Sequence, residues 1–209
     1  MELQLALDMI SFEKGLAIAR DLKDLIDVLE LGTPFSFVNP ISVIRHFKDN
    51  LPGVKILSDF KIMDGGYIMS KLAFDAGADI VTVSGRTWDI TIQEAITAAK
   101  ERGKLIHVDM MGVPDDQLEN RCGKLDSFQP AYIGIHRAVS IKESSPECSL
   151  RLARNMVKNA KLAVAGGINC ETLRRIMPFK PDLVIVGTAI TSAGDPRGAA
   201  LEIRDIMEG

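Results

Sequence analysis

Hydrophobic and polar positions follow two alternating patterns along the chain. Short apolar runs that end in a polar residue or glycine are followed by longer stretches in which apolar residues recur every third or fourth position. The first pattern is typical of buried parallel strands, and the second of amphipathic helices that cover them. The predicted strands are residues 3–8, 28–32, 55–61, 80–85, 104–109, 132–136, 161–167 and 183–188.

One predicted helix follows each predicted strand. These helices are residues 11–23, 39–48, 67–76, 91–101, 115–123, 146–159, 170–177 and 196–207. Eight strand–helix units predict an α/β protein, a (β/α)8 TIM barrel in a single domain spanning residues 1–209. An open doubly wound sheet is the alternative, but no G-x-G-x-x-G motif follows the first strand, which argues against its dinucleotide-binding form.

Composition narrows the class of protein. The 209 residues are 46% hydrophobic and 25% charged with a net charge of -3, so the chain lacks the basic surface of a nucleic-acid-binding protein. No apolar run approaches the roughly 18 residues of a membrane span, and no signal peptide precedes the first strand. The cysteines are odd in number and widely spaced, which predicts reduced structural thiols at Cys122, Cys148 and Cys170. We therefore expect a cytoplasmic protein without disulfides or zinc.

Polar side chains interrupt the strands at one end. Six of them lie at or near the carboxyl ends of predicted strands, on the parity opposite to their apolar neighbours: Asp8, Glu30, Asp59, Lys61, Asp109 and His136. They should point into the barrel mouth, where this fold carries its active sites. Burying four acids with one lysine is unfavourable, and a divalent cation would relieve it; carboxylates suit Mg²⁺.

Each of these residues also has a structural interpretation when it is taken alone. Asp59-x-Lys61-x-x-Asp64 is consistent with a solvated ion-pair cluster, and His136 with a hydrogen-bonded core histidine. His107 lies on the same face as Asp109, one layer deeper, and we predict that it is a hydrogen-bonded core histidine. The convergence of six polar residues at one end of the barrel favours an active site.

Glycines end the last two strands. Gly166 and Gly167 follow one strand, and Gly187 with Thr188 follows the next. In this barrel the loops after the seventh and eighth strands commonly bind phosphate, and glycine lets the backbone approach a ligand closely. Simple turn residues are the alternative. A phosphate site, a metal and acid–base groups together predict chemistry on a small phosphorylated sugar or polyol.

Several segments together resemble the 3-hexulose-6-phosphate synthase family, which is grouped with 3-keto-L-gulonate-6-phosphate decarboxylase in the orotidine-monophosphate decarboxylase superfamily. The matching segments are residues 5–8, 30–34, 59–66, 76–83 and 164–168. The resemblance runs nearly end to end. It implies a lyase on a (β/α)8 barrel, and a homodimer with active sites at the interface, where Asp64 reaches into the neighbour's site. It also implies Mg²⁺ held through Glu30 and Asp59.

Within this family the chain is more similar to the synthase. The decarboxylase has Glu at the position of Asp109, and it has Arg at the positions of Thr188 and Val139. One departure concerns residues 137–146, because synthases follow the strand-six histidine with Thr-Gly, whereas here Arg137 follows it. This segment is either a solvated loop or a cover over the substrate, with Arg137 or Lys142 reaching its phosphate or a carboxylate.

The mechanism that the resemblance implies begins with ribulose 5-phosphate held by Asp8 and by the phosphate-binding residues Gly166, Gly167, Gly187 and Thr188. His136 removes a C1 proton with Asp109 positioning it, and Mg²⁺ and Lys61 stabilise the enediolate that attacks formaldehyde. Lys61 is not expected to form a Schiff base, because flanking acids keep it protonated. The alternatives are the decarboxylase, a ribulose-phosphate 3-epimerase, which would want further metal-binding histidines, and a non-catalytic sugar-phosphate-binding barrel.

Overall fold

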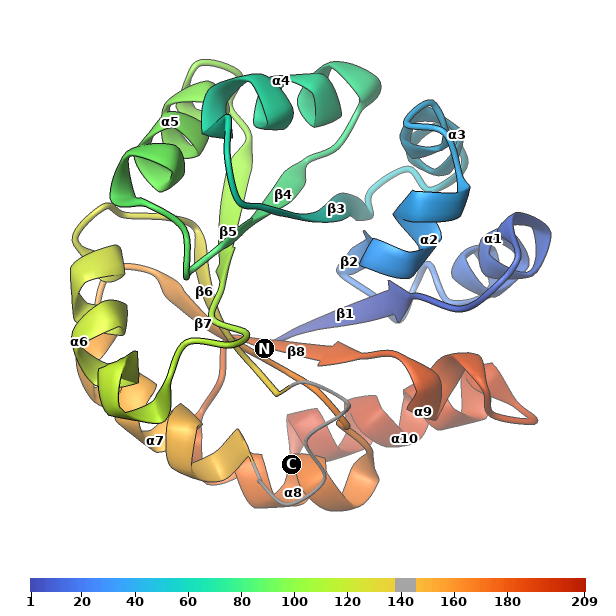
Figure 1. Cartoon of the computed structure of the whole chain (residues 1–209). Helices are drawn as coiled ribbons and strands as arrows, with labels where there is room; N and C mark the ends of the chain where they lie inside the picture. The colour runs from blue at the N-terminus through green and yellow to red at the C-terminus, as the bar shows by residue number, and fades with distance from the viewer. Residues whose placement is uncertain (138–145) are drawn as a thin grey trace.

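Parallel strands close into a barrel in the computed structural model, which describes residues 1–137 and 146–209 (Figure 1). Within these residues eight strands pair in chain order, and β8 returns to β1. Their bounds are β1 Glu2–Leu7, β2 Val28–Leu31, β3 Lys55–Ile62, β4 Ile80–Ser84, β5 Leu105–Asp109, β6 Tyr132–His136, β7 Lys161–Ala165 and β8 Leu183–Val186. The predicted (β/α)8 barrel is confirmed, and the open-sheet alternative is wrong.

Helices surround the barrel on its outside (Figure 1). They are α1 Phe12–Asp21, α2 Thr33–Val38, α3 Val43–Asn50, α4 Gly66–Ala76, α5 Asp89–Lys100, α6 Asp115–Asp126, α7 Pro146–Met156, α8 Cys170–Ile176, α9 Thr188–Thr191 and α10 Pro196–Glu208, with a short 3-10 helix at Met177–Phe179. None of the described helices has the length and apolar character needed to cross a membrane.

Two short helices, α2 and α9, were not predicted, and α3 begins four residues later than the sequence suggested. The helix predicted from residue 39 is interrupted there because Asn39 is extended, with φ −120° and ψ 145°. A residue that precedes proline is driven out of the helical region, so Pro40 separates α2 from α3. Pro34 lies in the first turn of α2, where a backbone N–H has no helical partner and the fixed φ of proline suits the helix.

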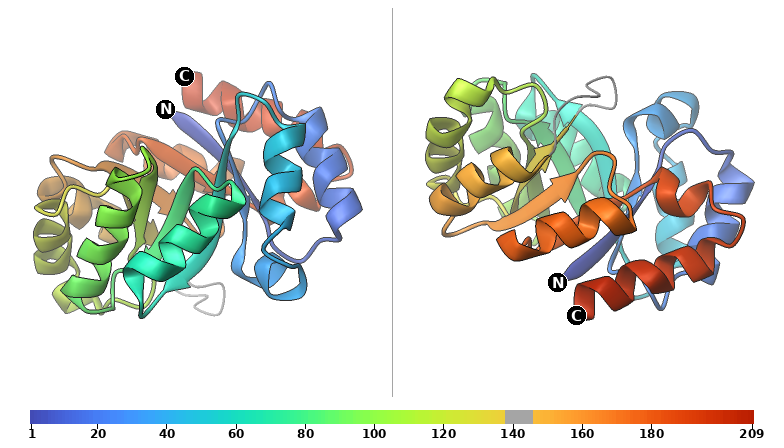
Figure 2. Two further views of the ribbon diagram at one scale, coloured as in Figure 1. Left: turned by 90° about the horizontal axis from the view of Figure 1, so that it is seen from above. Right: turned by 90° about the horizontal axis from the view of Figure 1, so that it is seen from below.

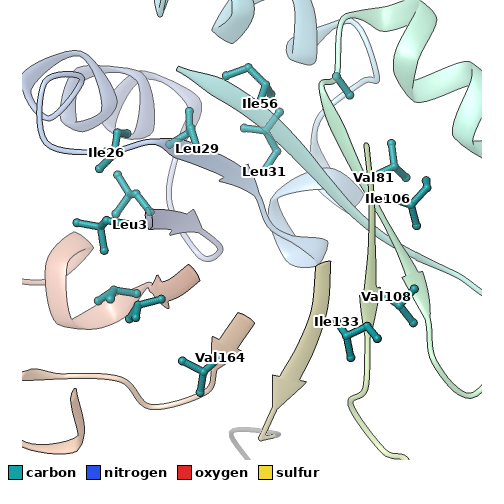
Figure 3. Close-up of a cluster of buried hydrophobic side chains, with 14 of the residues drawn as sticks. Leu3, Ile26, Leu29, Leu31, Ile56, Val81, Ile106, Val108, Ile133 and Val164 are labelled. Atoms are coloured by element: carbon teal, nitrogen blue, oxygen red, sulfur yellow. The ribbon is translucent and has the colours of Figure 1, made fainter. Parts of the chain in front are cut away.

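The main hydrophobic core lies between the strands and the helices. Alternate residues of β1, namely Leu3, Leu5 and Leu7, are fully buried on this outer side. Figure 3 shows residues of the same layer from neighbouring strands, among them Leu29 and Ile56. The other parity of each strand faces the barrel interior, so the outer core leaves the inner face available for polar groups.

Acids secure the amino-terminal end of the barrel. Asp27, Asp79 and Asp182 each precede a strand and accept a backbone N–H from a neighbouring one, at 2.8–2.9 Å. The carboxyl-terminal helix α10 is held beside the loop after α1, where Arg204 Nη2 donates to Asp27 Oδ2 at 2.7 Å. Figure 2 shows the two chain ends close together as a result. This end of the barrel is therefore braced, and the opposite end is open to carry the site.

Strand β3 departs from regular pairing at its carboxyl end. Ser58 pairs with Val81, but the next registered pair is Ile62 with Val83. Residues 59–61 therefore lie opposite Thr82 alone, and the strand bulges. Lys61 takes a φ of 43°, in the left-handed region that non-glycine residues rarely adopt. The bulge is the local feature that sets the geometry of the site.

Candidate active site

A cavity of about 420 Å³ opens at the carboxyl ends of the strands. Ten of the eleven residues predicted for the site line it: Asp8, Glu30, Asp59, Lys61, Asp109, His136, Gly166, Gly167, Gly187 and Thr188. It also contains Gln4, Thr33 and Thr82, which sequence reasoning did not single out. The sequence could have indicated Gln4 and Thr82, because each lies two residues from an inward-facing position of its strand and therefore faces inward as well.

Lys61 lies among carboxylates near the barrel mouth. Its Nζ forms an ion pair with Asp59 Oδ2, lies 3.4 Å from Asp109 Oδ2 and is 3.2 Å from Thr33 Oγ1. Burial alone would lower the pKa of Lys61, but the charges of Asp59 and Asp109 outweigh it and raise that pKa. Lys61 is therefore a fixed cation at neutral pH.

Asp109 connects the lysine to the histidine. Its Oδ2 is 3.0 Å from His136 Nδ1, and its Oδ1 accepts the backbone N–H of Met111 at 2.8 Å. Burial would raise the pKa of Asp109, but the hydrogen bond to His136 and the nearby positive charges hold it well below its usual range. An ionised Asp109 accepts the Nδ1 proton, so Nε2 is the ring nitrogen left to act as a base.

Asp8, Glu30 and Asp59 line the same cavity and influence one another's charge. Burial, and then the charge of Asp59, raises the pKa of Glu30 well above its usual value, and the same two causes raise the pKa of Asp8. Gln4 donates to Glu30 through Nε2 at 2.5 Å, and it is the only donor to this carboxylate among residues 1–137 and 146–209. This crowding is the electrostatic strain that a bound cation would relieve.

The donor set fits a magnesium ion of the kind the fold family implies. Within residues 1–137 and 146–209, no group of three or more His, Cys, Asp and Glu side chains could hold a metal. The resemblance implies Glu30 and Asp59 as the two protein ligands, and water and substrate oxygens would complete the shell, which is the arrangement Mg²⁺ favours. A carboxylate offers about four lone-pair sites; Asp59 uses three of them on Thr33, Thr82 and Lys61, and Glu30 uses one on Gln4.

The glycines after β7 and β8 differ in how much room a side chain would have. A Cβ on Gly166 would meet the carbonyl oxygen of Arg137 at 2.3 Å, and its φ is 99°. Gly167 has a φ of 68°, with open space where a Cβ would stand. Gly187 precedes α9, which begins at Thr188. Both strand ends therefore present backbone to the cavity rather than side chains.

Two of the predicted functional residues lie away from the cavity. Asp64 is exposed on the turn after β3, where its Oδ1 accepts the N–H of Gly65 at 2.8 Å, and it does not line the cavity of its own chain. Arg137 is directed to α6, with its Nη1 3.9 Å from Asp115 Oδ1. Lys142 and Val139 lie outside the described residues, as does most of the predicted covering loop.

His107 is buried, as predicted, but one of its two ring nitrogens lacks the expected hydrogen bond within the part of the chain that the structure describes. Among the described residues its Nδ1 has no partner, although the ring is only 3% exposed. Burial lowers its pKa to about 4, so the ring is neutral at pH 7. The ring occupies the space beside Gly134, where a Cβ would lie 2.1 Å from His107 Nε2. The missing side chain at residue 134 is what gives the histidine room.

Comparison with known proteins points to one family. Residues 1–203 match the family model described as orotidine 5'-phosphate decarboxylase / HUMPS. A curated 3-hexulose-6-phosphate synthase of Staphylococcus aureus (strain bovine RF122 / ET3-1) is 40% identical over 211 residues, covering 100% of both chains. The crystal structure of 3-hexulose-6-phosphate synthase from Salmonella typhimurium is 39% identical, with a TM-score of 0.94 over 100% of this chain and 99% of that one. That of 3-keto-L-gulonate-6-phosphate decarboxylase from Vibrio cholerae is 25% identical, with a TM-score of 0.85 over 99% and 97%.

Proposed function

Because the chain belongs to the orotidine 5'-phosphate decarboxylase / HUMPS family, we propose that it is a 3-hexulose-6-phosphate synthase-like aldehyde-lyase. The reaction is the Mg²⁺-dependent aldol condensation of ribulose 5-phosphate with formaldehyde. Full-length identity of 40% to a protein named as that synthase supports the class. The observation that carries the chemistry is the chain of contacts from His136 through Asp109 to Lys61.

His136 is the general base of the proposal. Nε2 takes a proton from C1 of ribulose 5-phosphate, and the electron pair of the C–H bond forms the 1,2-enediolate. C1 then attacks the carbon of formaldehyde, and the proton returns to the new oxygen to give the hexulose 6-phosphate. Asp109 holds the ring through Nδ1, which supports this assignment because the tautomer with a free Nε2 is then the favoured one.

Lys61 stabilises the negative charge that develops on the substrate oxygens. The raised pKa of Lys61 supports a role as a fixed cation rather than a nucleophile, since a Schiff-base lysine must lose its proton. Glu30 and Asp59 would hold the metal ion, which supplies a second positive charge beside the substrate when it is bound. Asp8 lines the cavity near Gly187, and its Oδ2 lies 3.7 Å from the position that a Cβ on this glycine would take. In this proposal Asp8 contacts a substrate hydroxyl.

The phosphate lies at the ends of β7 and β8 in this proposal. Gly166 and Gly167 expose backbone on one side, and Gly187 with Thr188 exposes backbone on the other. Barrels of this type commonly bind phosphate at these loops with the start of a short extra helix, a position that α9 occupies. Thr188 also offers a hydroxyl donor in place of the arginine of the decarboxylase.

A homodimer completes the proposed site. Apolar side chains beside Asp64 are between 46% and 80% exposed: Met63, Ile68, Leu72, Trp88 and Ile90. They belong to neighbouring segments, because Gly66 at the start of α4 packs directly on Thr91 of α5. An exposed apolar patch of this kind marks a protein–protein interface. A second copy docked there would bring the exposed Asp64 toward its partner's cavity.

The test is a coupled assay of the purified protein with ribulose 5-phosphate, formaldehyde and Mg²⁺. We expect Mg²⁺-dependent consumption of formaldehyde with formation of hexulose 6-phosphate. 3-Keto-L-gulonate 6-phosphate, run in parallel, separates the decarboxylase, and ribulose 5-phosphate alone separates a 3-epimerase. CO₂ release at a greater kcat/KM than the aldol reaction, or no turnover of any of the three, would overturn the proposal.

A further inference from the structure

Three residues of β3, Asp59 to Lys61, share a single partner position on β4. That position is Thr82, since Ser58 pairs with Val81 and Ile62 with Val83. A regular parallel ladder would pair the backbone N–H of Lys61 with a carbonyl of β4, and the bulge removes that pairing. The N–H is nevertheless satisfied, because it donates to Thr82 Oγ1 at 2.8 Å.

The same hydroxyl also holds the side chain of Asp59. Thr82 Oγ1 donates to Asp59 Oδ1 at 2.7 Å, and Thr82 is only 4% exposed. A hydroxyl has one proton to donate and lone pairs to accept, so both bonds form at once without competition. Thr82 thus joins the backbone of Lys61 to the carboxylate of Asp59 within the bulge.

The bulge matters because it sets the distance between the two functional groups. In an extended strand each residue advances by about 3.3 Å, which would carry Lys61 away from Asp59 along the barrel axis. Here Lys61 has a φ of 43°, and its Nζ turns back to form an ion pair with Asp59 Oδ2. A left-handed lysine persists only where its surroundings impose it, and the bond to Thr82 is the direct constraint on its N–H.

We propose that Thr82 is a positioning residue that fixes the β3 bulge and so places Lys61 and Asp59 for catalysis. It acts through these two residues and not by reacting with substrate. The kinetic consequence rests on the proposed function. The structural consequence, an ordered N–H at Lys61 and an oriented carboxylate at Asp59, does not depend on it.

The kinetic experiment compares two substitutions of Thr82 on β4 with a control substitution on the neighbouring strand β3. Thr82→Val keeps the shape but removes the hydroxyl, and Thr82→Ser keeps the hydroxyl. We expect Val to lower kcat by at least about 20-fold with little change in KM for ribulose 5-phosphate, and Ser to stay within about threefold of wild type. Ser58→Ala removes a buried hydroxyl that makes no hydrogen bond among the described residues, and it should leave kcat unchanged.

Two further measurements need no substrate. Binding of Mn²⁺, followed by electron paramagnetic resonance, should weaken at least about tenfold in Thr82→Val and not in Thr82→Ser. Hydrogen exchange on the unaltered protein should show the Lys61 amide protected like an amide of the regular ladder. This exchange measurement tests the proposal even if Thr82→Val does not fold.

The outcomes separate clearly. A fast-exchanging Lys61 amide, a Val variant with wild-type kcat and Mn²⁺ binding, or a Ser variant as impaired as Val would each overturn the role of the hydroxyl. If the assay shows no aldol reaction in the unaltered protein, but Mn²⁺ binding depends on Thr82 and the Lys61 amide is protected as expected, the reaction assignment fails and the positioning role stands.

Discussion

His136 Nδ1 lies 3.0 Å from Asp109 Oδ2, and this pair joins the carboxyl ends of β5 and β6. The bond fixes which ring nitrogen carries the proton, because the pKa of Asp109 is held well below its usual range and the carboxylate can only accept. The same Oδ2 also lies 3.4 Å from Lys61 Nζ. One carboxylate therefore orients the base and faces the cation.

We expect Asp109→Asn to lower kcat by roughly 10²- to 10⁴-fold, because an amide at this position no longer selects the tautomer with a free Nε2. KM for ribulose 5-phosphate should change little, since the proposed phosphate site is elsewhere. Steady-state kinetics beside Asp116→Asn, an exposed acid on α6, make the comparison. A loss of less than threefold would show that Asp109 does not orient the base.

Glu30→Gln should have opposite effects on metal binding and on stability. Burial and the charge of Asp59 raise the pKa of Glu30, so its ionised form is unfavourable in the metal-free fold. A neutral amide should stabilise the metal-free protein by on the order of 1 kcal/mol, about 2–4 °C in Tm, and weaken Mn²⁺ binding at least tenfold.

The measurements for Glu30→Gln are thermal unfolding in chelator and a Mn²⁺ titration. Glu13→Gln, which removes an acid in the first turn of α1, is the control for loss of one negative charge. A variant that is less stable without metal, or one that binds Mn²⁺ like wild type, would contradict the assignment of Glu30 as a strained metal ligand.

His107 should make stability depend on pH in a defined window. Burial lowers its pKa from 6.5 to about 4, so between these values the unfolded chain binds more protons than the folded one. Above pH 6.5 this histidine does not reduce the free energy of unfolding, and that free energy falls as the pH drops from 6.5 toward 4. The loss is about 3 kcal/mol at 1.36 kcal/mol for each pKa unit.

Urea unfolding of wild type and His107→Gln from pH 7.5 to 4.5 isolates this contribution, because the carboxylates titrate alike in both proteins. The free energy of unfolding of wild type, minus that of the variant, should decrease as the pH falls. A difference that stays constant with pH would mean that the ring is protonated inside the barrel.

The barrel and the polar ends of its strands were predictable because periodicity reports which face of a strand is buried. That signal placed Asp8, Asp109 and His136 on the inner face without any knowledge of the fold's dimensions. It also placed Asp59 and Lys61 together, although the structure achieves this through a bulge rather than through regular alternation. The outcome agreed with the prediction, but the geometry behind it was different.

Features that depend on contacts distant in sequence were not predictable. The left-handed backbone of Lys61 requires a hydroxyl from β4, which lies 21 residues away. The fit of the His107 ring beside Gly134 is a contact between β5 and β6 of the same kind. Likewise, the short helix α9 has only four residues, too few to give a periodic signal in the sequence.

The shared active site predicts rescue between two inactive variants. Asp64 is exposed outside its own cavity, whereas Lys61 lies inside it, so the proposed dimer draws these two residues of one site from different chains. Mixing Asp64→Asn with Lys61→Ala subunits creates hybrids in which one of two sites has both native residues. With random pairing in a symmetric dimer, about one quarter of wild-type activity should return.

The matched control mixes Asp64→Asn with the double variant Asp64→Asn/Lys61→Ala, where no hybrid site regains both residues and no activity should return. Differently tagged subunits and native mass spectrometry establish that hybrids form in both mixtures. Equal activity in the two mixtures, with hybrids present, would place Asp64 and Lys61 in the same chain's site or remove Asp64 from the site altogether. The comparison therefore tests whether Asp64 serves the partner's site separately from whether the chains dimerise, because both mixtures dimerise through the same surface.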